Sequence, residues 1–277
     1  MLNTRAGIST CANQERISAP VRTARIVTTS WDDGDPFDLK VAEHLRARNL
    51  PGTFYVTTAG YDGREPLEPA ELRTLASGGF EIGAHGVSHS ILTALSPKEL
   101  VREVRVCRTT LEDILGVPVP MFGYPKGRHN AKVIKQLKDA GYTGARTIHM
   151  LRQRLDFDPF LMPTSLLAVP ALKKLYVKNL LRSGNSRGLL DYLTQFIRLD
   201  SWVTLGKALF DQVLNEGGVW HLHGHSWEIE ELGLWDELKQ MLDYVSNREG
   251  VTYASNRGVL NFLPADRAPV SANHQIS

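Results

Sequence analysis

The chain of 277 residues is 42% hydrophobic and 22% charged, with a formal net charge of +2. It is long enough to bury a sizeable core, and its charge excludes a strong electrostatic attraction to nucleic acid. Its two cysteines exclude a disulfide framework, and neither a secretory signal nor an apolar span of about 18 residues is visible, so we expect a cytoplasmic protein.

The predicted elements begin after a polar, aperiodic stretch at 1–22, which we expect to be a flexible arm. From there to residue 146, apolar or β-branched runs alternate with amphipathic segments that carry helix-capping signals. They predict, in chain order, a strand at 25–29, a helix at 36–48, a strand at 53–57, a helix at 68–77, a strand at 80–84, a helix at 97–115, a strand at 119–123, a helix at 130–140 and a strand at 142–146.

The stretch from 147 to 200 is less regular. Within it, residues 172–187 combine an apolar stripe with five basic residues and no acidic one. A solvated amphipathic helix explains this pattern, and the alternative is a surface for a membrane, a lipid carrier or an anionic polysaccharide. Beyond it we expect a helix at 203–216, a strand at 219–223, a helix at 231–248, a strand at 251–253 and a flexible tail at 264–277.

The alternation of strands and helices predicts parallel strands with crossover helices in one α/β domain at 23–263, either a closed barrel or an open sheet. Active sites tend to lie at the C-terminal ends of such strands. Asp32 and Asp33 follow the first strand, and Gly34 breaks it so that both carboxylates can converge. An acidic turn without function is the alternative interpretation, so the histidines further on decide between the two.

The first histidine pair, His85 and His89, follows the third predicted strand. Two histidines four residues apart on a helical turn lie on one face, so both imidazoles can reach one metal ion. With a nearby Asp they offer two nitrogens and one oxygen. This ligand set suits a divalent transition metal, zinc first and cobalt or nickel as alternatives.

A second group, His221, His223 and His225, lies at the end of the strand at 219–223. The three share parity, so they point to the same side for as long as the strand persists. A buried histidine satisfied by hydrogen bonds is the usual explanation for any one of them, but not for three in five residues.

In this order, the Asp-Asp-Gly turn at 32–34, the His-x-x-x-His motif at 85–89 and the late histidines resemble the polysaccharide deacetylase family of metal-dependent carbohydrate esterases. The resemblance covers roughly residues 24–260. It implies a distorted (β/α) barrel of about seven parallel strands. It also implies a hydrolase that removes an N-acetyl group from an amino sugar or polysaccharide, in cell-surface polysaccharide metabolism.

The resemblance assigns the first motifs as follows: Asp32 is the general base, and Asp33, His85 and His89 are the metal ligands. The family's late Leu-x-His motif supplies a wall for the acyl methyl group and a histidine that acts as general acid. Two registers fit here, His221-x-His223 and His223-x-His225. We favour His225 as the acid and His223 as the wall.

The chain departs from the family at 123–126, where Gly-Tyr-Pro-Lys replaces the usual Arg-Pro-Pro-Tyr. The oxyanion donor is then the backbone N–H of Lys126, which needs no particular side chain. The arginine that orients the base is missing, and Arg146, at the end of its own strand, is our candidate for that task. The family's fourth motif has no counterpart within 147–170, which indicates a variant subgroup.

Two alternatives to an N-deacetylase of carbohydrates remain. One is a hydrolase of the same superfamily that cleaves another bond, either a deformylase of a lipid-linked sugar or an allantoinase-like hydrolase of cyclic amides. The other is an inactive carbohydrate-binding protein, which the missing arginine motivates. The product released from the substrate separates all three.

Overall fold

The computed structural model describes residues 24–170 and 173–267, and within them eight parallel strands form one sheet. The strands follow the order β5-β4-β3-β2-β1-β7-β6, and β8 pairs with the start of β1. Their bounds are β1 Arg25–Asp33, β2 Thr53–Val56, β3 Glu81–Ala84, β4 Met121–Gly123, β5 Gly144–Arg146, β6 Leu166–Leu167, β7 Gly218–His225 and β8 Thr252–Tyr253.

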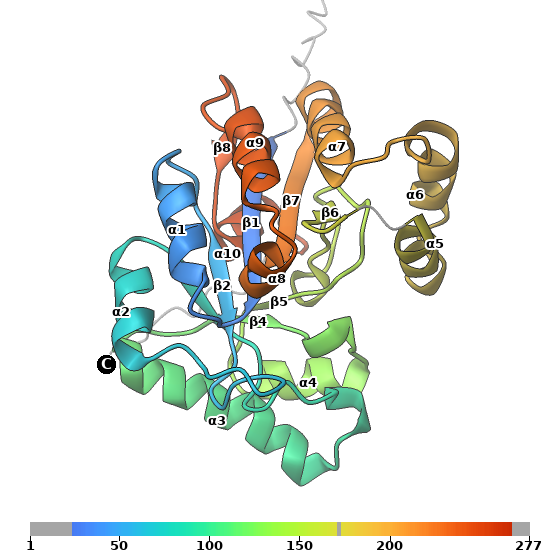
Figure 1. Ribbon diagram of the computed structural model, residues 1–277. Helices are drawn as coiled ribbons and strands as arrows, with labels where there is room; N and C mark the ends of the chain where they lie inside the picture. The colour runs from blue at the N-terminus through green and yellow to red at the C-terminus, as the bar shows by residue number, and fades with distance from the viewer. Residues whose placement is uncertain (1–23, 171–172, 268–277) are drawn as a thin grey trace, which may run out of the picture.

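Helices surround this sheet, with α1 and α2 on one side of the molecule and α5 and α6 on the other (Figure 1). The α-helices are α1 Asp38–Arg46, α2 Pro69–Ser77, α3 Pro97–Leu115, α4 Ala131–Asp139, α5 Lys173–Arg182, α6 Ser186–Asp191, α7 Trp202–Glu216, α8 Ser226–Glu231, α9 Trp235–Val245 and α10 Asn256–Val259. Short 3₁₀ turns lie at Leu92–Ala94, Pro125–Gly127, Pro159–Leu161 and Leu260–Phe262, and a π-helical turn lies at Tyr192–Phe196.

The predicted periodicities explain these elements. In β1 every residue from Ile26 to Asp33 is buried, as expected for a central parallel strand covered on both faces. Helix α3 begins at the predicted capping box, in which the Ser96 hydroxyl accepts from the N–H of Glu99 and the Glu99 carboxylate accepts from the N–H of Ser96. Its buried face joins the core that packs against the sheet.

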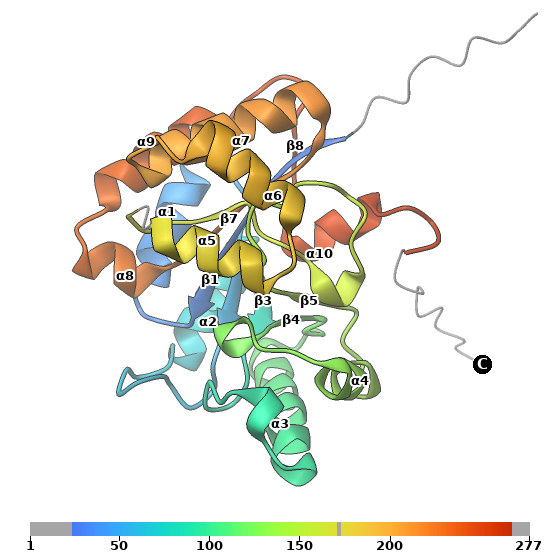
Figure 2. The ribbon, with the colours of Figure 1, turned by 90° about the vertical axis from the view of Figure 1, so that its right-hand side faces the viewer.

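The sheet curls into a barrel because one extended segment, 162–168, hydrogen-bonds to both of its edges. On one side, the N–H of Met162 donates to the carbonyl of Ala145 beside β5. On the other, the N–H of Ser165 donates to the carbonyl of His221 in β7. Figure 2 shows the strands gathered behind α5 and α6. The predicted barrel-like α/β fold in a single domain is confirmed.

Three local features differ from the predictions. The strand at 25–29 continues to Asp33 as β1, and the helix expected at 231–248 is the shorter α9, with a further helix, α8, before it. Gly233, with φ +66°, separates the two helices, because a left-handed residue cannot continue a right-handed helix. The two-residue strand β6 was not predicted, since it is defined by pairing with Leu222 and not by local pattern.

The predicted arm at 1–22 lies outside the described residues, as does the predicted tail at 264–277 from residue 268 onward. Among the described helices, none combines the length and the apolar character that crossing a bilayer requires.

Asn256 connects α10 to the sheet and generates a stability prediction. Its side chain is fully buried, donates to the Thr28 hydroxyl at 2.9 Å and accepts from the Tyr55 hydroxyl at 2.9 Å. Asn256→Ala leaves both partners unsatisfied, so we expect the free energy of unfolding to fall by about 3 kcal/mol. The exposed Asn215→Ala should change it by less than about 0.5 kcal/mol in the same urea titration. Equal midpoints for both variants would contradict the assignment.

Candidate active site

The two carboxylates lie at the C-terminal end of β1, between β2 and β7. The strand register places Asp32 beside His225 of β7 and beside Tyr55 of β2. Neighbouring residues of an extended strand point to opposite faces, but Asp33 has φ +82° and Gly34 has φ +76°. The chain therefore turns at Asp33, and both carboxylates reach one cavity.

Asp32 forms a buried ion pair with Arg146, the last residue of β5. Arg146 is fully buried, and its Nη2 donates to Asp32 Oδ1. Burial by itself raises the pKa of Asp32, but the Arg146 guanidinium together with the nearby His85, His223 and His225 outweighs it and holds that pKa well below its usual range. Asp32 is therefore an ionised carboxylate in a nearly dry site. The structure thus places the arginine named from the sequence against the predicted base.

Asp33, His85 and His89 bring one donor atom each to a common point, with these atoms within 4.8 Å of one another. Asp33 Oδ1 lies 3.6 Å from His85 Nε2 and 3.4 Å from His89 Nε2. The other carboxylate oxygen, Oδ2, accepts from the indole Nε1–H of Trp227 at 3.0 Å. One oxygen of Asp33 is thus fixed by the protein, and the other faces the two imidazoles.

The donor atoms of Asp33, His85 and His89 are suited to bind a divalent cation. His85 Nδ1 lies 2.8 Å from the Gly123 carbonyl, which can only accept, so Nδ1 carries the proton and Nε2 presents a lone pair. Asp33 Oδ1 and His85 Nε2 are both buried, and neither has a hydrogen-bond partner among the described residues. Burial lowers the pKa of His89 to about 3, so this imidazole is neutral as well. Tetrahedral zinc sets its ligands about 3.4 Å apart, close to the separations seen here.

The expected helical turn at 85–89 is wrong: these residues form a loop after β3. Gly86 has φ +85° and His89 has φ +55°, and both values are incompatible with a right-handed helix. The buried Glu103 of α3 holds the loop instead. Its Oε2 accepts from the N–H of Val87 at 2.8 Å and of Ser88 at 3.0 Å, and its Oε1 accepts from the Ser88 hydroxyl at 2.8 Å.

The late histidines do share one side, because β7 continues to His225. His221 is satisfied within the protein: its Nδ1–H donates to the Pro163 carbonyl at 2.9 Å, and its Nε2 accepts from the Ser30 hydroxyl at 2.9 Å. It does not line the cavity that holds the carboxylates. The geometry therefore favours the register of His223 and His225.

These two histidines differ in their electrostatic surroundings. His225 Nδ1 lies 3.0 Å from Glu228 Oε2. Burial opposes the charged imidazole, but the bond to Glu228 and the negative charges of Asp33, Asp32 and Glu228 together outweigh it and raise the pKa of His225. His223 Nε2 lies 3.8 Å from Asp32 Oδ2. Burial, assisted by Arg146, lowers the pKa of His223 well below its usual range. At neutral pH, His225 is the better proton donor of the two.

Both aspartates, His89, His223 and His225 line a cavity of about 280 Å³. Lys126 enters it from the turn at Pro125–Gly127, where it has φ +53°. Its wall combines several aromatic rings with a small number of converging polar groups, a composition typical of binding sites for small ligands. The lining side chains include Asp32, Asp33, Tyr61, His89, Tyr124, Lys126, Asn179, His223, His225, Trp227 and Glu228.

Sequence reasoning missed Glu103, Trp227 and Glu228. Two of them had a local signal, since Trp227 and Glu228 follow His225 within three residues at the start of α8. Glu103 interrupts the otherwise apolar buried face of α3, and an acidic residue at such a position indicates a specific partner. No local pattern in the sequence identifies that partner.

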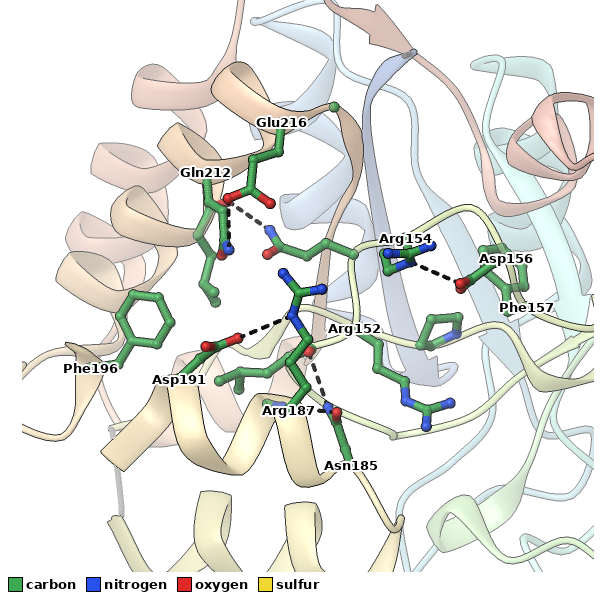
Figure 3. A pocket seen from close by; sticks show the side chains of 16 residues that line it. Arg152, Arg154, Asp156, Phe157, Asn185, Arg187, Asp191, Phe196, Gln212 and Glu216 are labelled. Atoms are coloured by element: carbon green, nitrogen blue, oxygen red, sulfur yellow. Dashed lines mark hydrogen bonds and ion pairs between the residues drawn. The ribbon is translucent and has the colours of Figure 1, made fainter. Parts of the chain in front are cut away.

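A second cavity, of about 390 Å³, lies beside the start of β7, at the other end of the barrel (Figure 3). Four of its charged side chains form two ion pairs: Arg154 Nε lies 2.9 Å from Asp156 Oδ2, and Arg187 Nε lies 3.9 Å from Asp191 Oδ2. None of the predicted site residues lines it. The smaller cavity is therefore the candidate active site.

Comparison with known proteins agrees with this geometry. Residues 20–145 match the family model described as polysaccharide deacetylase. Chitin deacetylase 1 of Cryptococcus neoformans is 33% identical over 99 residues, which make up 35% of this chain and 20% of that protein. The chain spans less than half of the length of the curated relatives it matches.

Solved structures share the fold over most of the chain. A family 4 acetyl xylan esterase from Clostridium thermocellum, in complex with a cobalt ion, has a TM-score of 0.55 at 14% identity and covers 87% of this chain and 93% of its own. A family 4 carbohydrate esterase from Streptomyces lividans, in complex with acetate, has a TM-score of 0.52 at 13% identity and covers 84% and 93%. Residues 20–145 therefore match the polysaccharide deacetylase family model, and the chain shares the fold of family 4 carbohydrate esterases.

Proposed function

We propose that the protein is a metal-dependent hydrolase that removes N-acetyl groups from the amino-sugar units of a polysaccharide. The observation that carries the proposal is the site at the end of β1: a carboxylate paired with Arg146, Asp32, lies beside the three-ligand group of Asp33, His85 and His89, and Asp32, Asp33 and His89 line one cavity. A match of 99 residues to a chitin deacetylase and the fold of carbohydrate esterases support the same activity.

The proposed cofactor is one divalent transition metal, zinc first, held by Asp33, His85 and His89. When bound, such an ion supplies a Lewis acid for the amide carbonyl and makes water near it more acidic. The protein's own contribution is to hold the ligand side chains in place. The Gly123 carbonyl does so for His85, and the Trp227 indole N–H does so for Asp33.

The remaining residues move protons and stabilise charge. Asp32 accepts a proton from the attacking water, and Arg146 keeps Asp32 ionised and oriented. His225, kept protonated by Glu228, donates a proton to the leaving amine. The backbone N–H of Lys126 donates to the developing oxyanion, an interaction typically worth about 3 kcal/mol. His223 remains neutral and forms part of the wall of the acyl pocket.

The direct test is the product released from a panel of N-acetylated oligosaccharides and polysaccharides. The proposal expects acetate together with a free amine on the sugar. Formate from an N-formyl sugar, or a ring-opened acid from a cyclic amide, would replace the proposal with another hydrolase of the superfamily. Binding of the glycan without any product would indicate an inactive carbohydrate-binding protein.

Variants of the two aspartates separate binding of the metal from proton transfer. Asp33→Ala and His85→Ala each remove a ligand, so we expect both bound metal and acetate release to be lost. Asp32→Asn should retain the metal and lower kcat by about 10²–10⁴-fold, the usual contribution of a general base. Metal content by elemental analysis and acetate release are measured on the same preparations. A fully active Asp32→Asn variant would refute its assignment as base.

Removing the carboxylate beside His225 should change the pH dependence of the reaction. Glu228 raises the pKa of His225, so Glu228→Gln lowers that pKa. Since the acid must be protonated to act, the alkaline limb of the kcat/KM profile should move to lower pH, and Glu228→Asp should restore it in part. An unchanged alkaline limb in Glu228→Gln would exclude His225 as the general acid.

The loop that carries His89 depends on Glu103. Glu103→Leu removes the acceptors for two backbone N–H groups and one hydroxyl, so we expect metal affinity to fall by about 10–100-fold. Glu103→Gln keeps a carbonyl acceptor and an amide that can donate to Ser88, so its affinity should stay near that of the unchanged protein. Competition with a chelator measures both, and equal affinities for the two variants would argue against this positioning role.

A further inference from the structure

The outer face of helix α5 has no role in the candidate active site described above. Its side chains form the rim and floor of a shallow surface groove: Lys173, Lys174, Val177, Lys178, Leu181 and Arg182. The opposite face packs inward through the buried Tyr176 and Leu180. We refer to the groove and its six side chains as the α5 face.

Positive charge is concentrated on α5 and on the segment that follows it, residues 173–200. Helix α5 contains four basic residues and no acidic one, and residues 173–200 contain six basic residues against two acidic ones. The entire chain has a formal net charge of only +2. Among the described residues of this segment, one salt bridge forms, between Arg187 and Asp191 at 3.9 Å. The four basic side chains of the α5 face therefore form a local positive surface suited to anions.

Apolar side chains accompany the charge. Leu181, on the α5 face, is 63% exposed, and Leu190 of the neighbouring α6 is 61% exposed. These are the two most exposed large hydrophobic residues in the described part of the chain. A soluble polyanion is bound by cations alone and makes no use of an exposed leucine. A bilayer surface uses both, since basic residues bind anionic headgroups and apolar side chains enter the acyl boundary.

We propose that the α5 face docks on an anionic lipid bilayer. Lys173, Lys174, Lys178 and Arg182 contact the headgroups, and Leu181 inserts between them. Each basic residue at such a surface contributes about a fivefold gain in affinity. The patch is small, so binding is reversible and depends on ionic strength.

Docking in this way places the candidate active site close to the bilayer. The inner side of α5 contributes Leu175 and Asn179 to the wall of the catalytic cavity. Asn179 also ties the helix to the barrel: its Nδ2 donates to the Ile148 carbonyl at 2.7 Å, and its Oδ1 accepts from the N–H of Met150 at 3.1 Å. The cavity then lies about one helix diameter, roughly 10 Å, from the membrane surface. On the proposed function, the substrate is a glycan anchored to or lying against the membrane.

The test is flotation of the purified protein with vesicles of phosphatidylcholine alone or of an equal mixture with phosphatidylglycerol. We expect binding to the anionic vesicles only, and lower binding at high salt. Lys178→Glu with Arg182→Glu should weaken it by at least about 30-fold. The matched control reverses two exposed charges of α3, Lys98→Glu with Arg102→Glu, and should bind as the unchanged protein does.

Leu181→Ser distinguishes a membrane from a soluble polyanion, because only insertion requires the leucine. The proposal expects weaker flotation for this variant. Failure to float with anionic vesicles, equal loss in the α3 control, or retention of a soluble acidic polysaccharide that is unaffected by Leu181→Ser would each overturn it. Acetate release from a soluble oligosaccharide should be the same in all of these variants. Flotation needs no catalysis, so the outcome does not depend on whether the proposed function is correct.

Discussion

The candidate site depends on one buried ion pair, between Asp32 and Arg146. A carboxylate taken out of water without a partner becomes protonated, and a protonated Asp32 could not accept a proton. Removing either partner of such a pair typically costs about 3–5 kcal/mol, because the other charge remains buried. Asp32 is the next-to-last residue of β1 and Arg146 ends β5, and these strands lie at opposite ends of a path through β2, β3 and β4. Only a curled sheet brings the two strands together, so the ion pair of Asp32 depends on the barrel.

The same pair accounts for the departure of residues 123–126 from the family pattern. Gly123 stands where the family has the arginine that orients the base. A Cβ added at Gly123 would lie 2.9 Å from His85 Nδ1, closer than real Cβ contacts, and 3.1 Å from Arg146 Nη2, tighter than most of them. The glycine therefore leaves the space through which Arg146 reaches Asp32, and its carbonyl fixes the tautomer of His85. An arginine supplied by β5 replaces one supplied by β4, and the carboxylate has a cationic partner either way.

The features that the sequence predicted are those set by local periodicity. The alternation of strands and helices, the capping box at Ser96 and the common side of His223 and His225 all follow from backbone geometry within a few residues. The features that it missed depend on partners far along the chain or on rare backbone conformations. Strand β6 exists because Leu166 pairs with Leu222. The loop that carries His89 exists because Gly86 and His89 adopt positive φ around a carboxylate from α3.

The two late histidines illustrate how the fold divides roles between identical side chains. They lie two residues apart on β7, with ring centroids 5.2 Å apart, so neither the strand nor the distance to the cavity distinguishes them. Their partners do, because His223 is buried beside Arg146 while His225 meets Glu228 as α8 begins. Glu228, three residues along the chain, therefore favours the protonated form of His225, whereas burial favours the neutral form of His223. In the proposed mechanism the acid is then protonated and the base deprotonated at the same pH.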